Sequence, residues 1–128
     1  MKKLLVFYLI LLSFFASYSY AEWTKITENV GGDVYYIDLD NIKENNGYLY
    51  FWYLRDYLKP DEYNDMSSKI LKEVDCNIPT KGRIIYSQYY TSPMGAGERS
   101  TSSDTASEWM YASPDSVFGQ LLDIVCNY

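Results

Sequence analysis

Hydrophobic and polar positions divide the 128-residue chain into one continuous apolar segment near its start and a series of short alternating segments after it. The apolar segment covers residues 4–12 and follows Lys2 and Lys3. From residue 22 onwards, apolar and polar side chains alternate over short stretches that are separated by glycine, asparagine or proline. Such alternation is typical of β-strands with one buried face. The pattern predicts a leader followed by a β-rich domain.

The leader has the three parts of a secretory signal peptide. Lys2 and Lys3 form a positive n-region, residues 4–12 form an apolar h-region, and small or polar residues lead to Ala21. The alternative is an uncleaved anchor, but a membrane-spanning helix needs about 20 apolar residues and this run is shorter. We therefore expect residues 1–21 to be a signal peptide that is cleaved after Ala21, leaving a single domain at residues 22–128.

The alternating segments predict five strands and a shorter sixth one. The strands are expected at residues 23–28, 34–39, 48–57, 67–76 and 83–91, with another beginning near residue 108. Segment 48–57 has bulky side chains at both its odd and its even positions, which predicts a central strand covered on both faces. A turn of helix is expected at 41–43. Segment 92–107 is rich in glycine, serine and threonine, and it predicts a long polar loop.

The C-terminal segment has the pattern of an amphipathic helix. Residues 113–115 read Ser-Pro-Asp, which supplies an N-cap, a proline for the first helical position and an acid for the first turn. Apolar side chains then recur at helical spacing from Val117 to Val125, and Cys126 ends the stripe. The elements together predict an α+β fold: an antiparallel sheet of about five or six strands with one C-terminal helix packed on a face.

Cys76 and Cys126 are the two cysteines of the chain, and both lie in the part expected to be exported. An oxidising compartment favours one intramolecular disulfide between them. Cys76 shares its parity with Ile70 and Val74, so the bond would tie the end of the helix to the core side of strand 67–76. A redox pair or a thiolate metal site has no support, because the chain lacks Cys-x-x-Cys spacing and further soft ligands.

Charge and composition exclude several classes of function. The chain has 11 basic and 17 acidic residues and no histidine, so its formal charge is −6. Loss of the two lysines of the leader would leave −8 on 107 residues. Without histidine there is no Ser/His/Asp or Cys/His nucleophile system and no imidazole ligand for zinc. The acid excess argues against nucleic acid as a partner.

No motif of the sequence assigns a cofactor, a metal or a catalytic residue. Asp38 and Asp40 resemble the start of an EF-hand loop, but Lys43 and Leu49 stand where glycine and a bidentate glutamate are needed. As an acid pair for glycoside hydrolysis they would need an enclosed cleft, which nothing in the sequence indicates. Residues 95–97 read Gly-Ala-Gly and lack the remainder of a dinucleotide-binding loop.

Aromatic residues are the most distinctive part of the composition. The chain has 15 tyrosines and three tryptophans, namely Trp23, Trp52 and Trp109. Most are expected in the sheet core and in cross-strand pairs. One helix cannot cover both faces of the sheet, however, so some aromatic surface is expected to be exposed. Tyrosine and tryptophan are enriched at interfaces, which favours a binding or self-association face.

Several segments occur in an order that resembles the surface-adhesin protein E family of Gram-negative bacteria. These segments are Glu22-Trp23-Thr24-Lys25, residues 35–40, Trp52, Asp56-Tyr57, Asp75-Cys76, residues 94–97, Ser107-Glu108-Trp109, Pro114 and residues 121–126. The resemblance implies an exported antiparallel sheet with a C-terminal helix tied to it by Cys76 and Cys126. It also implies a cell-surface protein that binds host matrix or serum proteins, is capable of forming a homodimer and associates with the outer membrane.

Two functional hypotheses follow. The first is an exported, non-enzymatic, adhesin-like binding protein, located in the periplasm or on the outer-membrane surface, that uses exposed aromatic side chains and segment 92–107; no individual ligand-binding residue is assigned. The alternative is a periplasmic acidic protein without adhesive role, such as an inhibitor of a basic enzyme. A charge of −8 would speed that encounter.

Overall fold

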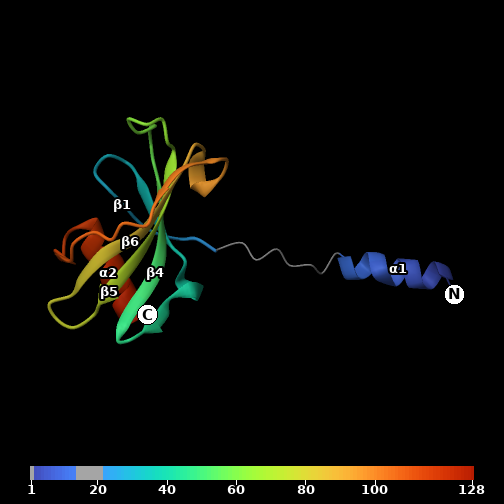
Figure 1. Cartoon of the computed structure of the whole chain (residues 1–128), viewed down its shortest axis with the longest axis horizontal. Helices are drawn as coiled ribbons and strands as arrows, with labels where there is room; N and C mark the ends of the chain where they lie inside the picture. Colours follow the sequence, from blue (N-terminus) through green and yellow to red (C-terminus); the bar gives the residue numbers. More distant parts are fainter. Residues whose placement is uncertain (1, 14–21) are drawn as a thin grey trace.

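The computed structural model describes residues 2–13 and 22–128 (Figure 1). Helix α1, Lys2–Ser13, falls within the predicted leader. The predicted cleavage site after Ala21 lies outside the described residues, and cleavage stays a prediction. Among the helices that the structure describes, none combines the length and the apolar character needed to cross a bilayer.

Residues 22–128 form an antiparallel sheet with one helix on a face, which confirms the predicted α+β class. In the described part of the chain the sheet has eight strands, in the order β1-β2-β4-β5-β6-β7, with β3 beside β4 and β8 beside β6. The elements are β1 Thr24–Glu28, β2 Val34–Ile37, η1 Leu39–Asn41, β3 Lys43–Asn45, β4 Tyr48–Asp56, β5 Ser67–Asp75, β6 Lys81–Tyr90, η2 Pro93–Gly95, β7 Arg99–Ser103, β8 Met110–Tyr111 and α2 Val117–Asn127.

The strand count exceeds the expected five or six because β3 and β7 carry weak sequence signals, whereas the strand expected near residue 108 is β8. β3 and β8 are very short, and they extend the sheet beside longer neighbours. β7 lies inside segment 92–107, so the prediction of a continuous loop there was wrong. All five residues of β7 are exposed, and β7 is defined by its backbone pairing with β6. A strand without buried side chains shows no alternation that a sequence could reveal. The predicted helical turn at 41–43 occurs two residues earlier, as η1.

β4 lies between β2 and β5, as its bulky sequence predicted. Phe51 and Tyr53 face α2, whereas Trp52 and Leu54 face the opposite side, which we call the open face. Leu54 is fully buried, and the 3₁₀ turn η2 lies near it. Trp52 is only half-buried. The expectation that both faces are covered is therefore correct for the α2 side and only partly correct for the open face.

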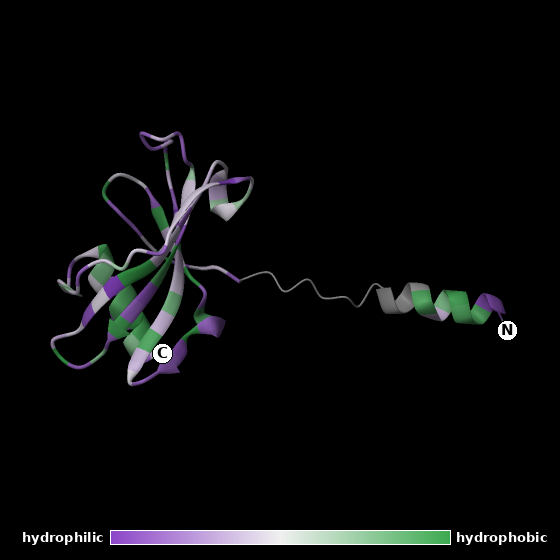
Figure 2. Ribbon diagram, viewed as in Figure 1, coloured by the Kyte–Doolittle hydropathy of each residue, from purple (hydrophilic) through white to green (hydrophobic). Residues whose placement is uncertain are grey.

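α2 packs its apolar stripe against the centre of the sheet (Figure 2). Burial of these side chains is the main favourable contribution to folding. The buried cluster consists of Tyr35, Ile37, Phe51, Val74, Leu121, Leu122 and Val125.

The N-terminus of α2 lies three residues beyond the predicted one. Ser116 caps the helix, because its Oγ accepts a hydrogen bond of 2.9 Å from the Gly119 N–H. Ser113 instead closes a turn with its carbonyl oxygen, which accepts from the Ser116 N–H at 3.1 Å. This turn lies directly against Gly119, where a Cβ atom would stand 1.9 Å from the Ser113 carbonyl oxygen. The Ser-Pro-Asp start was therefore wrong, since these residues form the turn that precedes the helix.

A disulfide joins Cys76, just after β5, to Cys126 in the last turn of α2. The two Cα atoms are 5.7 Å apart. The bond ties the C-terminal end of the helix to the edge of the core that α2 covers, as the sequence predicted.

Replacement of both cysteines by serine should lower the free energy of unfolding by about 4 kcal/mol, because the bond closes a loop of 50 residues in the unfolded chain. Urea titration of C76S/C126S beside the oxidised and the reduced wild-type protein measures this. The reduced wild type should match the double variant. Equal stability of the oxidised protein and the double variant would contradict a stabilising role of the disulfide.

The helix-facing side of β5 includes a lysine that sequence reasoning overlooked. Lys72 lies between Ile70 and Val74 on the same parity and is 8% exposed. Its ammonium stands 3.7 Å from the ring centroid of Phe118, in the first turn of α2. Among the described residues it forms no ion pair. Burial lowers the pKa of Lys72 to about 8.

Because of Lys72, the free energy of unfolding should increase as pH rises from 7 to 9.5. The pKa of Lys72 is about 8 in the folded state and ordinary, near 10.5, in the unfolded state, so the unfolded chain binds more protons in that window. Lys72→Met should remove this slope and raise stability at pH 7 by about 1–2 kcal/mol, after allowance for the lost contact with Phe118. Urea titrations at several pH values test this. Lys25→Met, at an exposed position, should keep the wild-type slope.

Candidate functional site

The open face of the sheet carries a band of aromatic side chains. Alternation along β4 directs Tyr48, Tyr50 and Trp52 away from α2. Tyr86 of β6 meets Trp52 edge to face, with ring centroids 6.0 Å apart. Near the end of the sheet formed by β8, Tyr48 lies 5.5 Å from Trp109. All five side chains are half-buried, so each presents part of its ring to solvent.

One row of the open face crosses five segments of the chain. Trp52 is paired with Leu71, and Leu71 with Tyr86. On the other side of Trp52, the Asp38 N–H donates to the Trp52 carbonyl oxygen at 3.2 Å. The register of β1 and β2, extended by one position, places Trp23 opposite Asp38. The Asp38 carboxylate therefore lies between Trp23 and Trp52, which belong to the neighbouring segments on either side of it.

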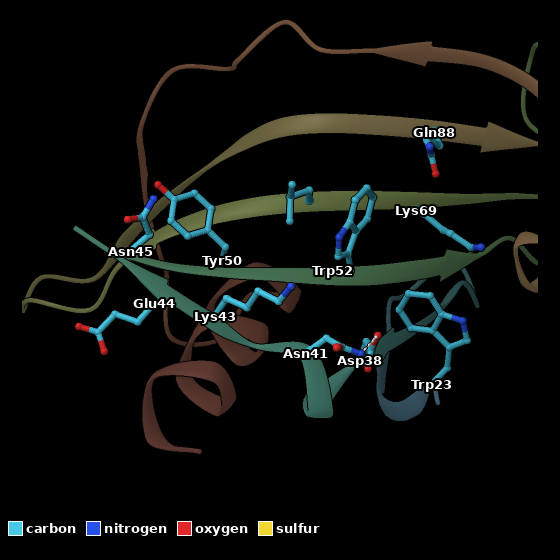
Figure 3. A pocket seen from close by; sticks show the side chains of 11 residues that line it. Trp23, Asp38, Asn41, Lys43, Glu44, Asn45, Tyr50, Trp52, Lys69 and Gln88 are labelled. Carbon is cyan, nitrogen blue, oxygen red and sulfur yellow. Dashed lines mark hydrogen bonds between the residues drawn. The ribbon is translucent and has the colours of Figure 1, made fainter. Parts of the chain in front are cut away.

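A hollow of about 680 Å³ lies over this row and extends along β3 and β4 (Figure 3). In Figure 3, Trp23 and Asp38 lie side by side at one end of the hollow, with Trp52 across from them. Lys43 and Lys69 contribute to its walls. The hollow is open to solvent and combines two indoles, the carboxylates of Asp38 and Glu44, and two ammonium groups.

Asp38 is the most unusual polar group at this hollow. It is 5% exposed. Its Oδ2 accepts a hydrogen bond of 2.8 Å from Asn41 Nδ2. Its Oδ1 is buried and has no hydrogen-bond partner among the described residues. A buried carboxylate oxygen without a donor is costly, since it loses hydration without compensation.

At the opposite end of the open face, polar side chains form a hydrogen-bonded network. The Tyr50 hydroxyl donates to Glu73 Oε2, and Arg83 Nε donates to Glu73 Oε1 at 2.8 Å. The hydrogen bond to Glu73 raises the pKa of Tyr50. The Arg83 guanidinium and the Lys81 ammonium lie 4.8 Å and 5.3 Å from the ring centroid of Trp109. Cation–π contacts of this kind hold both cations on the face.

A β-bulge makes this arrangement possible. Leu71 pairs with Tyr86 and the next residue, Lys72, pairs with Ile84, so Ile85 is an extra residue in β6. An extra residue reverses the parity of a strand beyond it. Tyr86 and Arg83 consequently share the open face although three positions separate them.

A second hollow, of about 730 Å³, lies on the α2 side of the sheet. The Arg55 guanidinium stands 5.5 Å from the Tyr35 ring and 5.4 Å from the Tyr57 ring. It donates to Asp33 Oδ2 at 2.7 Å, and the Leu58 N–H donates to Asp33 Oδ1 at 3.0 Å. Burial opposes ionisation of Asp33, but these donors outweigh it and lower its pKa. The charged groups here satisfy one another and fasten the turn before β2 to the end of β4.

The family profile described as Surface-adhesin protein E matches residues 23–127. The chain belongs to the surface-adhesin protein E family. Its fold is also that of solved structures of Haemophilus influenzae protein E. Crystal form II has a TM-score of 0.63 at 18% identity, with 86% of this chain and 91% of that chain covered. A second structure gives 0.62, with 86% and 87% covered at 18% identity. A comparison with curated proteins gives no significant match.

The structure separates the two acids that the sequence placed together. Asp38 is buried at the hollow, whereas Asp40 is exposed in η1. They form neither an enclosed acid pair nor part of a metal site, and no group of three His, Cys, Asp or Glu in the described ranges is placed to hold a metal ion.

Segment 92–107, expected to bind through a free loop, is tied to the sheet. The Met94 N–H donates to Asp56 Oδ1 at 2.8 Å, and the Gly95 N–H donates to Ser67 Oγ at 2.8 Å. The aromatic surface was predicted, but the row of Trp23, Asp38 and Trp52 was not, because only the strand register brings these residues together.

Asp33→Asn should lower the free energy of unfolding by about 1–2 kcal/mol at pH 7, since it removes the charge that pairs with Arg55. The pKa of Asp33 is lowered by folding, so its contribution is present at neutral pH and is lost as pH falls through the folded-state pKa. The difference between variant and wild type should therefore shrink below about pH 4. Thermal unfolding at pH 7 and pH 3 measures it; a difference independent of pH would contradict the assignment.

Proposed function

We propose that the protein is an exported, non-enzymatic, adhesin-like binding protein whose open face contacts a protein partner. The observation that carries the proposal is the half-buried aromatic band on the face that α2 leaves uncovered. Membership of the surface-adhesin protein E family supports it. Tyrosine and tryptophan give large contact areas at low entropic cost, which suits such a face to protein recognition.

Membership of the family supports a proposal for the class of partner. Host matrix or serum proteins are the proposed partners, and the face is accessible for a homodimer as well. Export depends on the predicted leader, and an adhesive role requires display on the outer-membrane surface and not only passage into the periplasm. Protease treatment of intact cells separates the two locations, because a displayed protein is digested and a periplasmic protein is spared.

The open face also bears on the alternative of an acidic inhibitor. Four cations lie on it or line its hollow: Lys43, Lys69, Lys81 and Arg83. The acids Asp38, Glu44 and Glu73 lie among them, so this face carries charges of both signs. Binding through an aromatic face should tolerate salt, whereas capping of a basic enzyme should weaken steeply as ionic strength rises.

Replacement of Trp52 and Tyr86 by leucine should weaken binding to immobilised animal matrix or serum proteins by about tenfold or more, since it removes the central aromatic pair of the face. Biolayer interferometry with the exported protein measures this at two salt concentrations. Tyr63→Leu provides a matched control, because Tyr63 is 77% exposed on the loop beside the second hollow. Equal binding by the double variant and the control would contradict the proposed face, provided that circular dichroism shows both to be folded.

A further inference from the structure

We propose that the hollow between Trp23 and Trp52 binds the ammonium group of a lysine side chain presented by the partner, with Asp38 as its counter-charge. This proposal rests on the proposed function, since it names the chemistry that the open face recognises. It arises from three independent features: the placement of the two tryptophans on either side of Asp38 in one row, the Asp38 oxygen that has no donor among the described residues, and the directions taken by the lysines already present.

The spacing of the tryptophans suits a chain of methylene groups. Trp23 and Trp52 flank Asp38 in one cross-strand row. Neighbouring strands lie about 4.8 Å apart, so the two tryptophan positions are about 10 Å apart across Asp38. A side chain inserted between two rings makes van der Waals contact with each at about 3.5–4 Å. Indole is also the aromatic group that attracts cations most strongly.

Asp38 supplies the negative charge at the base of this gap. Its Oδ1 has no donor among the described residues and is shielded from water, so it is an acceptor already freed of hydration. An ammonium N–H would provide the missing hydrogen bond, and such charge-assisted bonds are stronger than neutral ones. Trp23, the residue before β1, lies beside Asp38 at the end of the hollow (Figure 3), so its indole shifts to admit the guest to this oxygen and stays in contact with the guest's methylene groups.

The geometry favours lysine over arginine. Asn41 already occupies Oδ2 at 2.8 Å, so Asp38 offers one free oxygen. The bidentate fork that makes arginine a strong partner of carboxylates needs two. A lysine ammonium is a compact donor that needs one acceptor oxygen, and its stem is apolar.

The lysines in the walls of the hollow leave this position free. Lys69 directs its ammonium toward the Tyr90 ring, 4.9 Å from its centroid, and toward Gly95 of η2. Lys43 is exposed on β3 and forms no ion pair among the described residues. Lys43 is then a like charge near the guest, and its removal should strengthen binding of a cation.

The test uses Nα-acetyl-lysine methylamide as the probe and the exported protein labelled with ¹⁵N. The indole N–H signals of Trp23 and Trp52 should shift with the probe in a saturable way, and that of Trp109, at the other end of the face, should not. The norleucine analogue, which lacks the charge, should cause no saturable shift. The arginine analogue should bind about threefold more weakly.

Three variants decide the roles of the charges. Asp38→Asn should lower the affinity for the probe about tenfold. Asp40→Asn, which removes the same charge from an exposed position, should change that affinity less than twofold. Lys43→Met should raise the affinity for the probe about twofold. Equal affinity in the two asparagine variants, or an equal response to norleucine, overturns the proposal. If Asp38→Asn does not fold, the norleucine and Lys43→Met comparisons still decide.

The results of these experiments distinguish a failure of the lysine site from a failure of the proposed function. Binding of the probe without retention of any matrix or serum protein would support the lysine site and count against the adhesive role. Retention of a protein partner that depends on Trp52 and Tyr86, together with no response to the probe, would overturn the lysine site alone.

Discussion

The packing of α2 on one face of the sheet is the constraint on which the rest of the structure depends. Helix α2 covers the strands β2, β4 and β5, with the buried cluster between them, and a disulfide ties the end of the helix to the segment after β5. Because a domain of this size has a single helix for two faces, commitment of α2 to one face leaves the other to be covered by its own side chains. Large aromatic groups perform this task, since each covers much of the sheet while keeping an edge at the solvent.

Each face combines paired charged groups with one buried group that lacks part of its polar partners among the described residues. On the α2 side, Lys72 is enclosed without a counter-ion in the described part of the chain and its pKa falls, which is a cost that the surrounding apolar contacts offset. On the open face, Glu73, the next residue of β5, is paired with Arg83 and Tyr50. Asp38 is the exception on this face, because one of its carboxylate oxygens has no hydrogen-bond partner within residues 2–13 and 22–128. Binding sites commonly hold such unsatisfied groups, since a ligand can complete them.

Local patterns revealed the elements whose side chains are sorted by burial. The alternation around Ile70 and Val74 and the helical stripe from Val117 to Val125 both reflect contact with the core, so the α+β class, the central strand and the disulfide were predictable. β7 was not, because backbone bonds alone define it. The helix start was misplaced because two serines offer a cap and only tertiary contact with Gly119 selects Ser116. Trp23, Asp38 and Trp52 are far apart in sequence, and their meeting depends on strand order and register.

The extra residue Ile85 in β6 has a consequence for how this face tolerates change in length. On one side of it, Arg83 and Lys81 hold Trp109; on the other, Tyr86 completes the row that begins at Trp23. Deletion of Ile85 would remove the bulge and leave the pairs Leu71–Tyr86 and Glu73–Arg83 in place, so both halves would stay on the open face. The parity of this face therefore survives the loss of one residue at position 85, whereas a residue lost from a regular part of β6 would reverse the parity of the strand beyond it.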